Sequence, residues 1–242
     1  MQKEQSINDI LSETENPTQT ERSKLYLAMV LDESGSMCCG YQETINGFNE
    51  QLQTIKATQE DNVDVEVILT TFNFGAKVVK DFVALEDVAE LTENEYSPNG
   101  GTAMYDGVGL TISKLLERDD ITDDNTQVLM VVLSDGAENM SQKYTQSTVA
   151  EMIQTVKETN RWTITYMGAN QDLSKIAKGL NIDAGNTVIF DASDAGGYAA
   201  GANMRSAATA NFMGSLGAKG PNGDAGVQGD IQASTTFYSS VE

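Results

Sequence analysis

Two uninterrupted apolar runs that each stop at a carboxylate constrain the fold of this chain more than any other feature. The first covers residues 25–31 and ends at Asp32, and the second covers residues 128–133 and is followed by Ser134 and Asp135. A short continuous apolar run is typical of a strand buried on both faces, as in a parallel sheet covered by helices. In open sheets of this kind, ligands bind beyond the carboxyl ends of the strands, where both carboxylates would lie.

Alternating strand and helix patterns predict an α/β fold. Further strand patterns occur at 63–69, 76–82, 162–167 and 188–190, with helical patterns between most of them, including a short acidic helix over 85–91. Because only a short turn separates 63–69 from 76–82, these strands should form a hairpin, with the third strand as an antiparallel edge. We therefore expect a Rossmann-like, doubly wound, mostly parallel six-stranded sheet of order 3-2-1-4-5-6, with helices on both faces.

The two ends of the chain differ from this central region. Residues 1–22 are polar and mostly acidic, which predicts a flexible arm. Residues 197–216 are rich in small residues and fit a last helix. Glycine recurs at every third position from Gly214 to Gly229, as in collagen, but these triplets contain only one proline. We expect an arm over 1–22, a domain over 23–216 and a Gly-rich flexible tail over 217–242.

Composition excludes several classes of function. The chain has no histidine, so catalytic triads that use histidine and histidine-ligated zinc are excluded. Its formal net charge of −21 repels nucleic acids and anionic membranes, and neither is expected as a partner. No apolar run approaches the ~20 residues of a membrane helix, and residues 1–5 lack the apolar core of a signal peptide, so we expect a cytoplasmic protein. The neighbours Cys38 and Cys39 are expected to be reduced thiols, with a redox role as the alternative.

Three separate segments supply a candidate metal site. Asp32, Ser34 and Ser36 alternate directly after the first apolar run, Thr102 follows two glycines on a loop, and Asp135 follows the second run. Because the first and fourth strands are neighbours in the predicted order, the two carboxylates would lie side by side. Carboxylate and hydroxyl oxygens suit a hard cation such as Mg²⁺ or Mn²⁺. The structural alternative is that the aspartates cap helices and Thr102 is a turn residue.

The sequence around these residues resembles the von Willebrand factor type A (vWA) family. The matching segments are Val30-Leu31-Asp32-Glu33-Ser34-Gly35-Ser36-Met37, Gly100-Gly101-Thr102-Ala103-Met104-Tyr105-Asp106-Gly107 and Leu133-Ser134-Asp135-Gly136. The resemblance covers about residues 24–193 and is closest to stand-alone bacterial or bacteriophage members. It implies a complete metal-ion-dependent adhesion site (MIDAS) made of Asp32, Ser34, Ser36, Thr102 and Asp135. It also implies that an Asp or Glu of a partner protein completes the coordination of the metal.

The expected function is therefore a metal-dependent protein–protein interaction module without enzymatic activity. An AAA+ ATPase or a larger assembly is the expected kind of partner. One alternative is a structural or virion-associated assembly protein whose Gly-repeat tail oligomerises. Another is a Mg²⁺-dependent phosphoryl-transfer enzyme with Asp32 as its nucleophile. Against the enzyme, Ser34 stands where such enzymes usually carry a second carboxylate.

Overall fold

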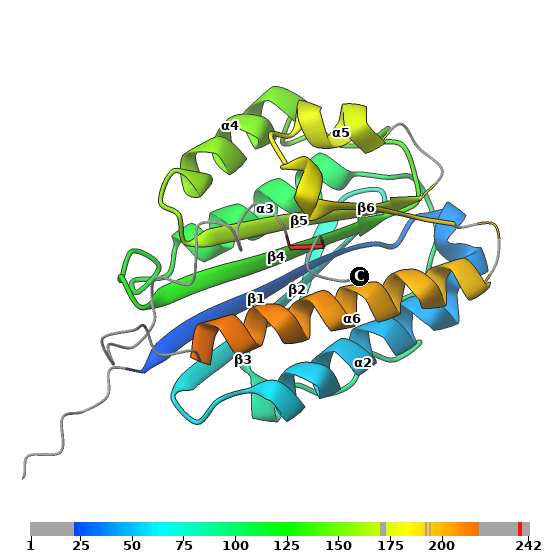
Figure 1. Cartoon of the computed structure of the whole chain (residues 1–242). Coiled ribbons are helices and arrows are strands. Elements are labelled where there is room, and N and C mark those ends of the chain that lie inside the picture. The colour runs from blue at the N-terminus through cyan, green and yellow to red at the C-terminus, as the bar shows by residue number, and fades with distance from the viewer. Residues whose placement is uncertain (1–21, 170–172, 192, 194, 218–236, 239–242) are drawn as a thin grey trace, which may run out of the picture.

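A six-stranded sheet forms the centre of the structure, a computed structural model that describes residues 22–169, 173–191, 193, 195–217 and 237–238 (Figure 1). The strands are β1 (Ser23–Asp32), β2 (Val63–Phe72), β3 (Ala76–Ala84), β4 (Thr126–Ser134), β5 (Trp162–Ala169) and β6 (Thr187–Phe190). Their order is β3-β2-β1-β4-β5-β6, and all neighbours are parallel except β2 and β3. The predicted strand order, mostly parallel sheet and antiparallel edge strand are confirmed.

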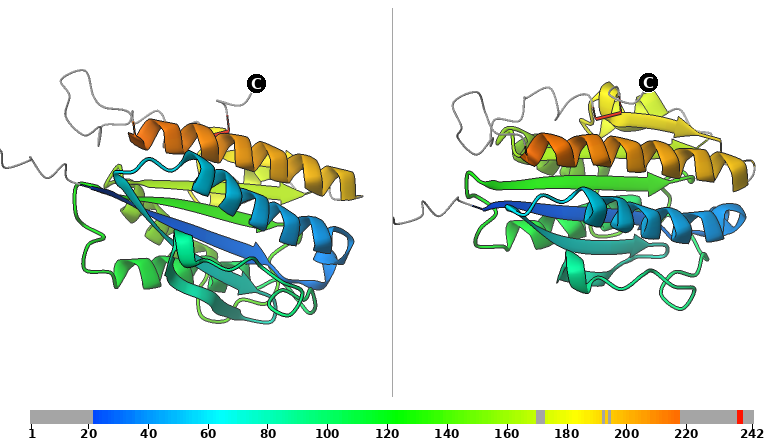
Figure 2. Two further views of the ribbon diagram at one scale, coloured as in Figure 1. Left: turned by 90° about the horizontal axis from the view of Figure 1, so that it is seen from below. Right: turned by 60° about the horizontal axis from the view of Figure 1, so that its bottom comes forward.

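Helices cover both faces of the sheet (Figures 1 and 2). On one face α2 (Tyr41–Thr58) and α6 (Ala195–Gly217) lie side by side, and on the other lie α3 (Met104–Leu116), α4 (Gln146–Lys157) and α5 (Leu173–Gly179). Short 3-10 helices are formed by η1 (Gly35–Gly40), η2 (Leu85–Asp87) and η3 (Ala184–Asn186). None of the helices in the described part of the chain is long and apolar enough to span a membrane.

Strand β1 is uninterruptedly apolar over residues 25–31 because it contributes to two separate hydrophobic cores. Successive side chains of a strand point to opposite faces of the sheet. Leu25, Leu27, Met29 and Leu31 pack on the side of α2 and α6. Tyr26, Ala28 and Val30 pack on the side of α3 and α4. This double burial explains the apolar run, and it leaves polar residues only at the ends of the strand.

The C-terminal part of the chain agrees with the sequence only in part. Helix α6 forms where a last helix was expected. Two residues of the expected flexible tail, Phe237 and Tyr238, are instead buried, and the ring of Phe237 lies against Phe212. The Phe237 backbone N–H donates to Asn186 Oδ1 at 2.8 Å, and that of Tyr238 donates to the Gly185 carbonyl at 3.1 Å. These two residues of the predicted tail are thus packed against α6 and η3. Residues 1–21, 218–236 and 239–242 lie outside the described residues, so the flexible arm and tail stay predictions.

Candidate metal centre

The candidate site begins where β1 and β4 end next to each other. Leu31 and Leu133 are register partners, so Asp32 and Ser134 follow them at the same edge of the sheet. The Ser134 hydroxyl donates to Asp32 Oδ2 at 2.5 Å, and the Ser34 backbone N–H donates to Asp32 Oδ1 at 2.7 Å. The fully buried Asp32 carboxylate is thus oriented from both sides.

A chain of hydroxyls links the loop after β1 to the loop after β4. Ser34 Oγ and Ser36 Oγ lie 3.0 Å apart, and Ser36 Oγ donates to Asp135 Oδ1 at 2.5 Å. These contacts bridge two segments that are about a hundred residues apart in sequence. Four of the five predicted ligands therefore lie within one small cluster.

The fifth predicted ligand, Thr102, joins this cluster at Gly136. A Cβ atom placed on Gly136 would lie 2.8 Å from Thr102 Oγ1, 3.3 Å from Ser36 Oγ and 3.6 Å from Asp32 Oδ2. Oxygens from three segments thus converge around a space that stays open only because residue 136 has no side chain. These are the hard oxygen donors that Mg²⁺ and Mn²⁺ take, so the residues present fit such a cation.

The loop that carries Thr102 is held by the loop that follows β4. Asn139 Oδ1 accepts from the Thr102 N–H at 3.0 Å, and the Thr102 carbonyl accepts from the Asn139 N–H at 3.0 Å. The sequence did not identify Asn139 as a site residue, because its role depends on a contact between two distant loops.

Two further carboxylates tie the loop after β4 to the start of α3. Glu138 accepts from the Tyr105 N–H at 3.0 Å, and the buried Asp106 accepts from the backbone N–H groups of residues 142–144 at 2.9–3.0 Å. An acidic residue in the first turn of a helix was the signal that could have indicated Asp106, which lies in a segment that resembles the vWA family. These bonds fix the position of Thr102.

The part of the same loop that precedes Thr102, residues 96–101, contacts the end of β1 and the loop that follows it. The Tyr96 hydroxyl donates to the Asp32 carbonyl at 2.6 Å, and the Gly35 N–H donates to the Gly100 carbonyl at 3.2 Å. Gly100 has φ +79°, and a Cβ there would lie 2.4 Å from the ring of Phe74. Phe74, between β2 and β3, is 60% exposed, so an accessible aromatic ring stands at the rim of the site.

Helix α6 also reaches the site, through Tyr198. The Tyr198 hydroxyl donates to Asp135 Oδ2 at 2.6 Å. With the bond from Ser36 to the other oxygen, both oxygens of Asp135 are oriented. No sequence signal pointed to Tyr198, which lies 63 residues from its partner.

The charge of the site is unbalanced. Burial raises the pKa of Asp32 to about 6, a shift that the negative charge of Asp135 increases and the hydrogen bonds from Ser134 and Ser34 oppose. Among the described residues, no ion pair involves Asp32 or Asp135. The described residues also contain no group of three or more His, Cys, Asp or Glu side chains that could hold a metal. The candidate site combines two carboxylates with hydroxyl groups instead. Two carboxylates without a protein cation form a site that attracts a metal cation.

Solved structures show the fold to which this architecture corresponds. No family model and no curated protein matches the sequence. The vWF domain of the type V pili tip protein Mfa5 from Porphyromonas gingivalis is 12% identical, with a TM-score of 0.57, and the match covers 79% of this chain and 96% of that one. The pilus adhesin SpaC from Lactobacillus rhamnosus GG is 13% identical, with a TM-score of 0.58, over 80% of this chain and 30% of that one. The chain therefore has the Rossmann-like vWA fold.

A mussel protein gives a further match. Proximal thread matrix protein 1 from the mussel byssus is 15% identical to this chain, with a TM-score of 0.55. The match covers 75% of this chain and only 45% of the mussel protein. At these identities the likeness concerns the fold alone.

Proposed function

We propose that this chain is a metal-dependent protein–protein interaction module with a MIDAS-type site for Mg²⁺ or Mn²⁺. The proposal depends on one observation, which is the convergence of five oxygen-bearing side chains at the carboxyl ends of β1 and β4. The residues that would hold the cation are Asp32, Ser34, Ser36, Thr102 and Asp135.

The composition of this site favours the binding of a partner's carboxylate. Three of the five residues would offer neutral hydroxyls, and Mg²⁺ keeps several waters in its octahedral shell. A cation held in this way supplies positive charge that attracts a further anionic ligand. The role of the chain's own residues is positional: Ser134 and Tyr198 orient the two carboxylates, and the loop contacts of Asn139 fix Thr102. An Asp or Glu of a partner protein would complete the coordination.

The surroundings of the site define the kind of partner surface that fits. Phe74 stands exposed beside the loop that carries Thr102 and offers an apolar contact next to the metal. The net charge of −21 slows the approach of a strongly acidic partner, so a surface that combines the metal-binding carboxylate with basic or apolar residues fits best. Our proposal includes a cytoplasmic location and a role beside an AAA+ ATPase or within a larger assembly.

The environment of Asp32 supports a non-enzymatic role. Ser34, two residues after Asp32, stands where a phosphoryl-transfer enzyme with an aspartate nucleophile usually carries a second carboxylate. The Lys77 ammonium pairs with the Glu33 carboxylate, at 3.0 Å, and not with Asp32. We expect no hydrolysis of a panel of phosphate esters in the presence of Mg²⁺, and turnover that disappears in Asp32→Asn would contradict this part of the proposal.

Calorimetric titration of Mg²⁺ and Mn²⁺ into chelator-treated protein tests the site directly. We expect saturable binding to the wild type and none to Asp32→Ala, because this substitution removes one of the two carboxylates. Asp64→Ala is the matched control, since Asp64 pairs with Arg22 on the surface at the other end of the sheet. Saturable binding that persists unchanged in Asp32→Ala would refute the metal site.

Partner capture with and without a chelator tests the interaction itself. The full-length chain should retain partners from a cell extract in Mg²⁺ and release them in EDTA, and Asp32→Ala should behave like the chelated wild type. Equal recovery in both buffers would refute a metal-dependent interaction even if the cation binds.

A further inference from the structure

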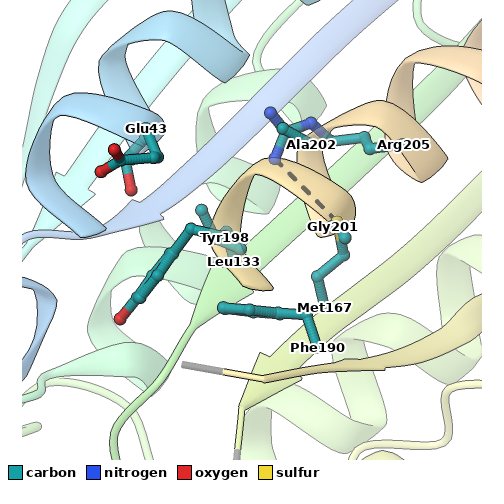
Figure 3. A pocket seen from close by; sticks show the side chains of 9 residues that line it. Glu43, Leu133, Met167, Phe190, Tyr198, Gly201, Ala202 and Arg205 are labelled. Carbon is teal, nitrogen blue, oxygen red and sulfur yellow. Dashed lines mark hydrogen bonds between the residues drawn. The ribbon is translucent and has the colours of Figure 1, made fainter. Parts of the chain in front are cut away.

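Arg205 lies in the interior of the protein, away from the surface that basic side chains usually prefer. It belongs to α6 and is only 2% exposed, where the helix packs against α2. Its guanidinium faces the backbone of α2 so closely that a Cβ on Gly47 would lie 2.8 Å from Arg205 Nη2. Figure 3 shows the Arg205 side chain above Met167 at one side of a small cavity.

This buried cation has no carboxylate partner in the described part of the chain. Within the described ranges, Arg205 Nη1 donates to the sulfur of Met167 alone, at 3.9 Å, and Arg205 Nε has no hydrogen-bond partner. No ion pair among the described residues includes Arg205. Burial lowers the pKa of Arg205, and the electrostatic effect of Tyr238 and Glu50 opposes this shift. A guanidinium nevertheless keeps its proton in proteins. Its charge therefore needs a counter-ion, because an uncompensated buried charge is strongly unfavourable.

The adjacent cavity provides room for a counter-ion. It measures about 10 Å³, is lined by Arg205, Thr44 and Tyr198, and has Leu133, Met167 and Phe190 as its apolar wall (Figure 3). A space of this size matches one water molecule, and a water molecule would not neutralise the guanidinium. An ion of chloride size is somewhat larger and requires a small shift of the flexible Met167 side chain, which lines the cavity. Glu43 also lines the cavity, but no ion pair among the described residues joins it to Arg205, and Figure 3 shows its carboxylate pointing away from Arg205.

We propose that Arg205 binds a single small monovalent anion of chloride size in the cavity between α2, α6 and the ends of β4–β6. The site is separate from the metal centre, although Tyr198 borders both. The bound anion would neutralise Arg205, which is buried between α2 and α6. Larger anions such as gluconate do not fit the space.

Thermal unfolding of the full-length chain in sodium chloride and in sodium gluconate tests this proposal. Equal sodium concentrations keep the screening of the acidic surface constant, so only the anion differs. We expect the wild-type Tm to rise by roughly 3–5 °C for each tenfold increase in chloride above its dissociation constant, as for any ligand that binds the folded state alone. Arg205→Met should lose this dependence, while Arg22→Met, which changes an exposed arginine paired with Asp64, should keep it.

The same comparison has outcomes that would overturn the proposal. A wild-type Tm that is the same in both salts, or a chloride dependence that persists in Arg205→Met, refutes the site. Glu43→Gln should leave the chloride dependence unchanged, and a large loss of Tm in this variant together with no chloride effect would identify Glu43 as the counter-ion instead. If Arg205→Met does not fold, crystals of the wild type soaked in bromide decide the question. An anomalous peak within hydrogen-bond distance of Arg205 supports the site, and its absence refutes it.

Discussion

The two ends of strand β1 carry polar clusters of opposite character. At the amino end, Lys24 pairs with Asp120 at 2.6 Å and with Glu66 at 2.9 Å, and Arg118 pairs with Glu66 at 3.2 Å. The Tyr26 hydroxyl, between them, donates to Asp120 at 2.5 Å. At the carboxyl end, Asp32 and Asp135 share a cluster of hydroxyls. Neither aspartate forms an ion pair with a lysine or arginine among the described residues. One cluster is neutral within the protein, and the other is not.

The pKa values of the two aspartates reflect this difference. Burial acts to raise the pKa of Asp120, but the hydrogen bonds from Lys24 and Tyr26 outweigh burial and leave the pKa below its usual value. For Asp32, burial dominates and raises the pKa to about 6. The comparison shows that a polar cluster can be classed by whether its charges balance: a balanced cluster contributes to stability, whereas an unbalanced one invites a ligand.

Exchanging each aspartate for asparagine should separate binding from stability, and it should have the largest effect of the substitutions considered. Asp32→Asn removes a charge that the cation needs, so we expect affinity for Mg²⁺ to fall by about 100-fold or more, which corresponds to at least about 2.7 kcal/mol. Asp120→Asn should bind Mg²⁺ as the wild type does, because it changes the opposite end of β1. Calorimetric titration measures both, and equal losses in the two variants would break the distinction between the clusters.

Filling the space at Gly136 should weaken the metal site without removing any ligand. A Cβ at this position would lie 2.8 Å from Thr102 Oγ1, so Gly136→Ala must displace one of the converging oxygens. We expect a loss of about 10- to 100-fold in Mg²⁺ affinity, comparable to the loss of a residue that orients a ligand. Gly75→Ala is the control, because a Cβ there meets nothing within 4 Å. If Gly136→Ala binds Mg²⁺ normally, the cation does not lie in this space.

The balanced cluster should show its role in stability. Asp120→Asn leaves Lys24 with a weaker partner, and we expect the free energy of unfolding to fall by about 2 kcal/mol at pH 7. Because the folded-state pKa of Asp120 is depressed, its contribution is present above the unfolded value of 3.8 and is lost as the pH falls below it. Urea denaturation of the metal-free proteins should therefore show a penalty at pH 7 that disappears in acid. Asp32→Asn should show no comparable penalty, since it removes an unbalanced charge.

The sheet and the five candidate ligands were predictable because both follow from local patterns. A strand buried on two faces must be apolar, and the apolar runs over 25–31 and 128–133 therefore located β1 and β4 directly. The strand order then brought Asp32 and Asp135 together, since a parallel sheet places both carboxyl ends at one edge. The structure assembles these residues as the sequence indicated, and their role as metal ligands remains a prediction.

The remaining features depend on tertiary contacts that carry no local signal. Residues 85–91 were expected to form a short helix, but only Leu85–Asp87 is helical, as the 3-10 turn η2. The side chain of Asn49 bonds both the N–H of Leu91, at 2.7 Å, and its carbonyl, at 3.1 Å, and so replaces helical hydrogen bonds. Tyr198 and Arg205 likewise acquire their roles only because α6 packs against α2 and the ends of the strands.

Ser134 provides the finest test of the comparison, because it affects orientation alone. Ser134→Ala removes the hydroxyl that donates to Asp32 Oδ2 but leaves all five candidate ligands in place. We expect Mg²⁺ affinity to fall by about tenfold, since a partner that orients a ligand typically contributes this much. Ser215→Ala is the matched control, because the Ser215 hydroxyl donates to the Phe212 carbonyl near the C-terminal end of α6, away from the site. An unchanged affinity in Ser134→Ala would mean that Asp32 is held by its burial and by the Ser34 N–H alone. The carboxyl end of β1 would then differ from the amino end only in charge balance, and preorganisation by hydrogen bonds would have no measurable part in the site.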